Sequence, residues 1–216
     1  MAYVRGEPAL GLRERKKQRT RAMLIDAAVE LCNRQGFDHT TVDQIAAIAD
    51  VSPRTFSRYF ATKDAIALAL IDEILGVAAV ELARQPTDIS HFEALRRSYV
   101  SIANAAKVAP AGGLSADRLM CIMRIIVSST TLRQVAVEYR GSVIDAVLAE
   151  RMGVTLDDRR LKMVSALWGS IVMTALTDVV DQTADFDKLG IDDVVAHLEL
   201  TFAEFAAEVA RVRLPV

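Results

Sequence analysis

The chain has 216 residues, of which 52% are hydrophobic, 25% are charged and 6% are aromatic. This length allows one large or two small domains with a sizeable core. Because glycine and proline are few and no β-hairpin signature occurs, the composition favours an all-helical fold over a β-rich one. Cys32 and Cys121 lie in separate predicted helices, and no Cys/His cluster has metal-ligand spacing. The sequence therefore argues against a disulfide scaffold, and we expect no metal and no cofactor.

The net charge of −2 is unevenly distributed along the chain. Residues 1–63 contain eleven basic and seven acidic side chains, a net charge of +4, whereas the remainder contains fifteen and twenty-one, a net charge of −6. A basic head on an acidic body indicates that one end meets phosphate and that the other end has a different role.

The longest uncharged run, residues 163–177, is bounded by Lys162 and Asp178. Its fifteen residues are short for a membrane span and include Ser, Gly and Thr, so we expect a buried helix. The N-terminus is charged and no apolar segment follows it, which argues against a secretory signal. These features predict a cytoplasmic protein with no membrane partner.

Residues 1–14 contain two glycines and a proline without periodicity, which predicts a flexible arm. Residues 13–21, RERKKQRTR, contain six basic residues and one acidic residue. Such a run is either the solvated start of a helix or a segment that follows the phosphate backbone or enters a minor groove. We expect the first long helix from about residue 17 to residue 35. It should end at Gly36, and Phe37 should insert into a small core.

Residues 40–63, TTVDQIAAIADVSPRTFSRYFATK, predict two short helices joined by a tight turn. Apolar side chains recur at helical spacing over residues 42–49, and Thr41 with Gln44 fits a capping box. Residues 50–51 are expected to form the turn.

The second of these helices is predicted to start at Ser52, a capping residue, with Pro53 at its first position. Phe56 and Phe60, four residues apart, supply its buried face. The remaining Ser, Thr, Arg and Tyr side chains point elsewhere, and these residue types hydrogen-bond base edges and phosphates from within a major groove. The alternative interpretation is a polar helix face that merely meets water.

Three motifs occur in one order: AAVELCNRQGF, then TTVDQIAAIADVS, then RYFATKDA. Together with the basic start they resemble the N-terminal domain of TetR-family transcriptional regulators, over about residues 15–70. The segment SPRTFSRYFATKDA is similar to family members of the mycofactocin-regulator type. The resemblance implies a three-helix DNA-binding domain at residues 15–61, whose second and third helices form the helix-turn-helix.

The resemblance places the groove-facing side chains on the third helix, with phosphate contacts from Thr40 or Thr41 and from Lys63. Since an arginine that is bidentate to guanine is the commonest direct readout contact, Arg54 and Arg58 predict at least one G·C pair in each half-site. Including the basic run, the expected DNA contacts are Arg15, Lys16, Lys17, Arg19, Thr40, Thr41, Ser52, Pro53, Arg54, Thr55, Ser57, Arg58, Tyr59 and Lys63.

Residues 62–216 are predicted to form a helical body for ligand binding and dimerisation. Apolar periodicity predicts helices at residues 62–83, 92–106, 116–128, 130–152 and 156–182, the last of which should be capped by Thr155. We expect a loop at residues 184–190 and then a final helix that starts at Asp192 or Asp193. In the family the last two helices of each subunit pair to form a homodimer, and Gly169 and Ser170 would allow close helix approach there. The alternative is that these helices line the core of a single subunit.

The resemblance also implies a small-molecule pocket between the body helices. Met and Trp side chains favour an apolar, adaptable cavity, and Arg124 could meet a carboxylate. For any one residue, the alternative is an ordinary core or surface position. The expected lining residues are Tyr99, Met120, Met123, Arg124, Trp168 and Met173, and the expected effector is mostly apolar.

The favoured function is a dimeric, ligand-responsive repressor that binds a palindromic operator in double-stranded DNA and is not an enzyme. An all-α enzyme of the helical-bundle type would need a Glu-x-x-His pair, and only Asp88-x-x-His91 occurs. No P-loop or nucleophile elbow is present. A second alternative is a DNA-binding protein whose body binds a protein partner.

Overall fold

The computed structural model describes residues 11–110, 113–181 and 189–212. Over these residues the chain forms helices and no strand, which confirms the predicted all-α class. The chain divides into two compact units, residues 1–63 and 64–216. Within the described ranges, no helix combines the length and the apolar character needed to cross a membrane.

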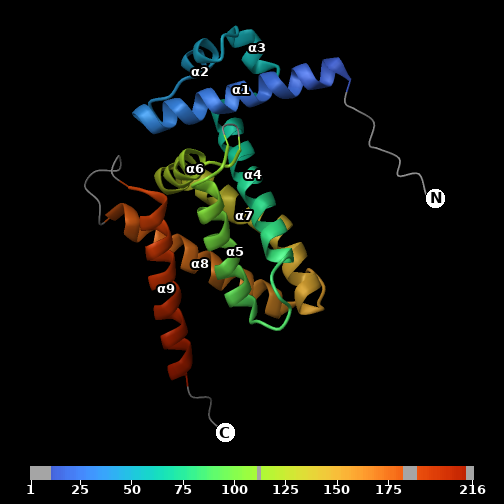
Figure 1. The fold of residues 1–216 in the computed structure, drawn as a ribbon, viewed down its shortest axis with the longest axis vertical. Helices are drawn as coiled ribbons and strands as arrows, with labels where there is room; N and C mark the ends of the chain where they lie inside the picture. The colour runs from blue at the N-terminus through green and yellow to red at the C-terminus, as the bar shows by residue number, and fades with distance from the viewer. Residues whose placement is uncertain (1–10, 111–112, 182–188, 213–216) are drawn as a thin grey trace, which may run out of the picture. The chain divides into compact units, whose positions relative to one another are not determined.

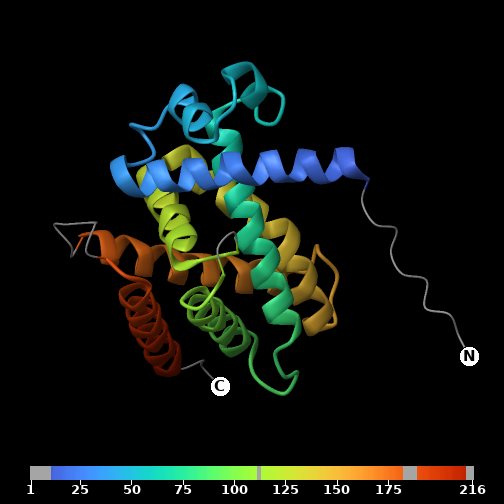
Figure 2. The ribbon, with the colours of Figure 1, turned by 45° about the horizontal axis from the view of Figure 1, so that its top comes forward.

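The first unit contains α1 (Leu12–Gln35), α2 (Val42–Ile48) and α3 (Pro53–Ser57). Figures 1 and 2 both show α2 and α3 on the same side of α1. Its core includes Leu24, Ile45 and Phe56, which are at most 1% exposed. Phe37 is buried beside them, as the sequence predicts.

α1 begins at Leu12, before the position that apolar periodicity indicates. The basic run is therefore helical, and residues 12–14 belong to this helix and not to the arm predicted over residues 1–14. The first turns are made of Leu, Arg, Glu, Lys and Gln, which all have high helix propensity. They carry no apolar stripe, so periodicity cannot find them. The rest of the predicted arm lies outside the described residues.

Side-chain caps set the ends of α2 and α3. Thr41 and Gln44 form the predicted capping box, in which the Thr41 amide donates to Gln44 Oε1 at 3.0 Å. Ser52 caps α3, and its Oγ accepts from the Thr55 amide at 3.1 Å. The turn between the helices passes through Asp50 at φ 52°, a left-handed conformation that Asp tolerates better than most residues.

The second unit begins within α4 (Lys63–Ala83), a helix whose first residue belongs to the first unit. It continues through α5 (His91–Ala106), α6 (Ala116–Ser128), α7 (Thr130–Met152), α8 (Arg159–Asp181) and α9 (Ile191–Arg211). α5 and α8 pack against each other and against α9, as both ribbon views show.

α8 begins later than predicted, at Arg159 and not at Leu156. Asp158 acts at this end, because its Oδ1 accepts from the Arg160 amide at 2.7 Å and its carbonyl accepts from the Lys162 amide at 3.2 Å. Thr155 therefore precedes a turn and does not cap the helix. The predicted loop at residues 184–190 lies largely outside the described residues.

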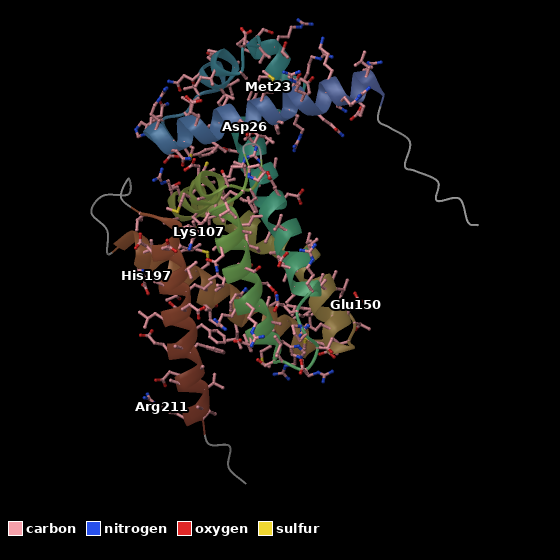
Figure 3. All side chains as sticks on the ribbon, in the orientation of Figure 1. Met23, Asp26, Lys107, Glu150, His197 and Arg211 are labelled. Atoms are coloured by element: carbon pink, nitrogen blue, oxygen red, sulfur yellow. The ribbon has the colours of Figure 1, made fainter. Side chains whose placement is uncertain are left out.

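Ion pairs join α5, and the residue that follows it, to α9. Arg96 of α5 donates to Glu93 at 2.7 Å and also pairs with Glu199 of α9. Lys107, which follows α5 and is labelled in Figure 3, pairs with Asp192 at the start of α9. These ion pairs connect positions far apart in sequence, so helical periodicity does not reveal them.

The Glu93–Arg96 pair predicts acid sensitivity of the body. Hydrogen bonds from Arg96, and also from Arg97, lower the pKa of Glu93 from 4.5 to about 2. A lowered pKa means that the pair stabilises the fold fully above pH 4.5 and that this contribution is lost as the pH falls towards 2. We expect Glu93→Gln to lower the melting temperature at neutral pH and to show a smaller further loss between pH 4.5 and 2. Thermal unfolding followed by circular dichroism measures this.

The control for this experiment is Glu204→Gln, which changes an exposed carboxylate on α9. Its melting curve should follow that of the wild type at every pH. Parallel acid profiles for the wild type and Glu93→Gln would contradict the assignment.

Candidate DNA-binding surface and ligand cavity

α3 has one buried face and one exposed polar face. Phe56 and Phe60 are 1% and 4% exposed, and their ring centroids lie 6.0 Å apart. Their burial turns Arg54, Ser57 and Arg58 towards solvent. Within the described part of the chain, no hydrogen bond or ion pair holds the Arg54 or Arg58 guanidinium group. Both guanidinium groups are therefore available for a phosphate or a guanine edge.

The hydroxyl groups of α3 have local partners. Ser52 Oγ and Thr55 Oγ1 lie 2.9 Å apart, and Ser57 Oγ donates to the Pro53 carbonyl at 3.1 Å. Thr55 and Tyr59 are half-buried, whereas Ser52 and Pro53 are exposed. The predicted α3 residues thus form one surface on which the arginines are the long, unpaired side chains.

The structure separates the two threonines that were predicted as phosphate contacts. Thr40 is 2% exposed, and its hydroxyl donates to the Gly36 carbonyl at 2.9 Å. Thr41 is exposed at the start of α2. Of the two, Thr41 is the residue that an external phosphate can reach.

Lys63 has partners that the sequence did not reveal. Its Nζ donates to the carbonyls of Phe37 at 2.8 Å and Asp38 at 3.2 Å, and lies 4.6 Å from the centroid of the Phe37 ring. The ammonium group therefore ties the start of α4 to the loop between α1 and α2. Since an ammonium group has three donors, a phosphate contact by Lys63 stays a prediction.

The basic run lies on the exposed start of α1, where Arg15, Lys16, Lys17 and Arg19 all face solvent. Arg21, which the sequence did not single out, lies 5.1 Å from the centroid of the Phe60 ring. This cation–π contact holds the end of the basic run next to the α3 segment. The only signal in the sequence is that Arg21 belongs to the same basic run.

A cavity of about 140 Å³ lies within the second unit, between α4, α5, α6, α8 and α9. Its wall is almost entirely apolar, and Tyr99 is the lining residue whose side chain ends in a polar group. The lining residues are Ile74, Leu75, Ala78, Tyr99, Ile102, Ala103, Leu119, Ile122, Met123, Ile126, Gly169, Val172, Met173, Ala175, Leu176, Ile191, Val194, Val195 and Leu198.

Three of the six predicted lining residues, Tyr99, Met123 and Met173, face this cavity. Met120, Arg124 and Trp168 do not line this cavity, so a ligand contact by these three residues stays a prediction. Periodicity identifies the inner face of a helix, but it does not tell which part of that face meets a neighbouring helix and which part meets a cavity.

Trp168 is instead a core residue, 1% exposed, whose ring meets Tyr99 edge-on at a centroid distance of 5.2 Å and Phe202 at 6.3 Å. It therefore contacts the cavity wall indirectly, through Tyr99. A contribution of α4 was not predicted, yet Ile74, Leu75 and Ala78 of this helix line the cavity.

No group of three or more His, Cys, Asp and Glu side chains in the described ranges could hold a metal ion. Two short helices with a polar, arginine-bearing second helix, joined to a helical body with a pocket, define a helix-turn-helix DNA-binding regulator.

Comparison with known proteins agrees with this class. The family model for bacterial regulatory proteins of the tetR family matches residues 24–70. The HTH-type transcriptional regulator TcmR of Streptomyces glaucescens is 34% identical over 154 residues, which cover 68% of this chain and 67% of that protein. The chain belongs to the TetR family of transcriptional regulators. The resemblance to mycofactocin-regulator-like members stays a prediction.

Solved structures share the fold. The FadR repressor of Thermus thermophilus, a TetR-family protein in complex with lauroyl-CoA, has a TM-score of 0.56 at 23% identity and covers 90% of this chain and 97% of its own. SmeT, the repressor of the Stenotrophomonas maltophilia multidrug efflux pump SmeDEF, has a TM-score of 0.56 at 19% identity and covers 85% and 89%.

The exposed arginines of α3 lead to a prediction about DNA affinity. Arg54→Ala and Arg58→Ala should each weaken binding to the operator by about 1–3 kcal/mol, because each removes a base or phosphate contact. The matched control is Arg34→Ala, which removes an exposed arginine near the C-terminal end of α1 that pairs with Glu30. Fluorescence anisotropy on a footprinted fragment measures the three affinities. Wild-type affinity in both α3 variants would remove α3 from the interface.

The cavity leads to a second prediction, because apolar cavities of about 150 Å³ in other proteins take up benzene. We expect benzene to raise the melting temperature and to change the fluorescence of Trp168, the single tryptophan. Ala103→Phe should abolish both effects by filling the cavity, whereas Ala105→Phe, at an exposed position on the same helix, should retain them. An unchanged benzene response in Ala103→Phe would show that benzene binds elsewhere.

Proposed function

We propose that the protein is a ligand-responsive repressor that binds a palindromic operator as a homodimer through α3 and is released by a mostly apolar small molecule. The observation that carries the proposal is the exposed, unpaired Arg54 and Arg58 on α3. An arginine fork reads guanine or phosphate, so each half-site should contain at least one G·C pair. The basic face of α1 and Thr41 would add phosphate contacts that position the head.

The cavity wall supports an apolar effector. With Tyr99 as the polar exception, the lining favours a ligand with a ring-sized or larger apolar part and few polar groups. FadR of Thermus thermophilus is described with lauroyl-CoA, whose acyl chain is apolar. That likeness extends to the fold alone, so the lining residues of this chain are the argument for the effector class.

Exposed apolar stripes on α8 and α9 support the homodimer. On α9 they repeat at intervals of four and three residues, the spacing of one helix face that packs against another helix. Leu200 is 56% exposed there, and Met163 on α8 is 55% exposed. The exposed positions are Met163, Ala166, Leu167, Ser170 and Thr174 on α8, and Ala196, Leu200, Ala203, Ala207 and Ala210 on α9.

This pattern favours pairing with a second copy, since a two-fold DNA reader needs two heads. Ser170 fits the predicted close approach, whereas Gly169 is buried at the cavity. We also assign residues 15–61 to DNA binding and residues 62–216 to effector binding and dimerisation. The division into compact units after Lys63 supports this assignment. A cytoplasmic location would fit a protein that meets the chromosome.

The two alternatives are weaker. The family consists of regulators, which argues against the helical-bundle enzyme. A body that binds only a protein partner would leave the apolar cavity without a role.

An effector that opposes DNA binding needs only to bind one conformational state of the protein more tightly than the other. Coupling free energies of roughly 1–3 kcal/mol between two binding sites are typical.

Footprinting on the region upstream of the protein's own gene tests the proposal. We expect one protected site with two-fold symmetry, and Leu200→Asp should convert the dimer to a monomer and weaken protection, because a charge then faces the partner helix. Val80→Asp is the matched control, since Val80 is 51% exposed on α4. Analytical ultracentrifugation gives the oligomeric state. A monomeric wild type, or no protected site at low salt, would contradict the proposal.

A further inference from the structure

The second unit contains one ion pair whose arginine is buried. Arg118 is 6% exposed and is the single charged side chain in the buried core of the described residues. Its Nη1 donates to both carboxylate oxygens of Glu73, at 2.9 and 3.1 Å. Arg118 belongs to the first turn of α6 and Glu73 to the middle of α4, so the pair connects two helices.

Each member of this pair is the sequence neighbour of residues that line the cavity. The residues that follow Glu73 on α4, Ile74 and Leu75, line the cavity, and so does Leu119, which follows Arg118 on α6. A ligand that displaces Leu119 therefore moves the helical turn that carries Arg118. The pair is the charged contact closest in sequence to the lining residues of both helices.

α4 has polar anchors at both of its ends as well. At its start, Lys63 donates to the carbonyls of Phe37 and Asp38. Beyond its C-terminal end, Arg151 of α7 donates to the carbonyl of Gln85 at 2.9 Å and also to that of Pro86. α4 thus has polar contacts along its length. Lys63 at its start contacts the loop before α2, Glu73 in its middle contacts α6, and the segment after its end contacts Arg151 of α7.

We propose that the Arg118–Glu73 ion pair transmits occupancy of the cavity from α6 to α4, and so sets how strongly the effector opposes DNA binding. This inference rests on the function proposed above. The pair makes Arg118 and Glu73 positioning residues that touch neither the effector nor the DNA.

The physical reason lies in how the two helices can move relative to each other. Apolar surfaces can slide past one another while they keep their buried area, because the hydrophobic effect has no direction. Separating the Arg118 guanidinium group from the Glu73 carboxylate would break two charge-assisted hydrogen bonds, at 2.9 and 3.1 Å, which are directional contacts between the two helices. A displacement of α6 by a ligand therefore moves α4 with it, and α4 leads directly to Lys63.

The test compares variants that remove or restore the pair. Glu73→Leu with Arg118→Met removes both charges without leaving one unpaired, and Glu73→Arg with Arg118→Glu restores the pair in reverse. Glu73→Gln keeps a hydrogen-bond acceptor but removes one charge. The control is Arg160→Met, which removes the exposed partner of Asp158 at the start of α8.

The quantity measured is the coupling factor, defined as the ratio of the Kd for the footprinted fragment at saturating benzene to the Kd without benzene. We expect about 10-fold in the wild type, within the range typical of allosteric proteins, and a value near 1 in the Leu/Met double variant. The reversed pair should recover most of the factor, and Glu73→Gln should lie between. The affinity for benzene, followed through Trp168 fluorescence, should be the same in all variants. If the pair only stabilised the fold, its removal would be expected to change this affinity as well.

A second measurement does not depend on DNA. Benzene should change hydrogen exchange of the α4 amides at residues 64–72 in the wild type and in Arg160→Met, and should leave these amides unchanged in the Leu/Met variant. If benzene does not bind, Ala103→Phe serves as the means of filling the cavity. Hydrogen exchange of the same α4 amides is then compared between Ala103 and Ala103→Phe, once with the ion pair intact and once in the Leu/Met variant.

The two proposals fail in different ways. A wild type that ignores DNA refutes the repressor function, while the exchange experiment still tests the ion pair. A Leu/Met variant with the wild-type coupling factor and the wild-type exchange response overturns the role of Arg118 and Glu73, and leaves the repressor function standing. A Glu73→Gln variant with the full wild-type factor also overturns it, because the charge is then not needed.

Discussion

Burial of Phe56 and Phe60 is the interaction on which the DNA-binding surface depends. α3 has five residues, too few to be stable as an isolated helix. Its shape comes from the Ser52 cap at one end and from the two phenylalanines that pack into the core of the first unit. Because that face is buried, Arg54 and Arg58 can only point away from it. The DNA contacts proposed for these arginines therefore depend on an apolar contact inside the first unit.

The second unit combines an apolar interior with a few ion pairs and side-chain hydrogen bonds between its elements. Its cavity is surrounded by five helices, and an apolar wall of this kind can adapt to a ligand without breaking hydrogen bonds. The polar contacts between elements are made by residues outside this wall: Arg118 with Glu73, Arg96 with Glu199, and Arg151 with the carbonyls after α4. In the proposed mechanism the packing around the cavity changes with the ligand, while these contacts hold α4 to α6 and α5 to α9.

Local features were predictable because they depend on neighbours within one or two turns. The Thr41–Gln44 capping box, the Ser52 cap, the Asp50 turn and the buried phenylalanines all follow from spacings of three or four residues. The start of α1 was placed too late, because its charged first turns have helix propensity but no apolar stripe. The start of α8 was placed too early, because Asp158 competes with Thr155 for the cap.

The sequence by itself determined the helices, the polar face of α3 and the separation of a basic head from an acidic body, since periodicity and charge are properties of adjacent residues. The tertiary structure alone decided that Thr40 is buried, that Lys63 holds the Phe37 and Asp38 carbonyls, and that Trp168 packs against Tyr99 outside the cavity. It also decided that Arg118 meets Glu73, 45 residues away. Such partners are chosen by how the helices pack, and no spacing along the chain encodes them.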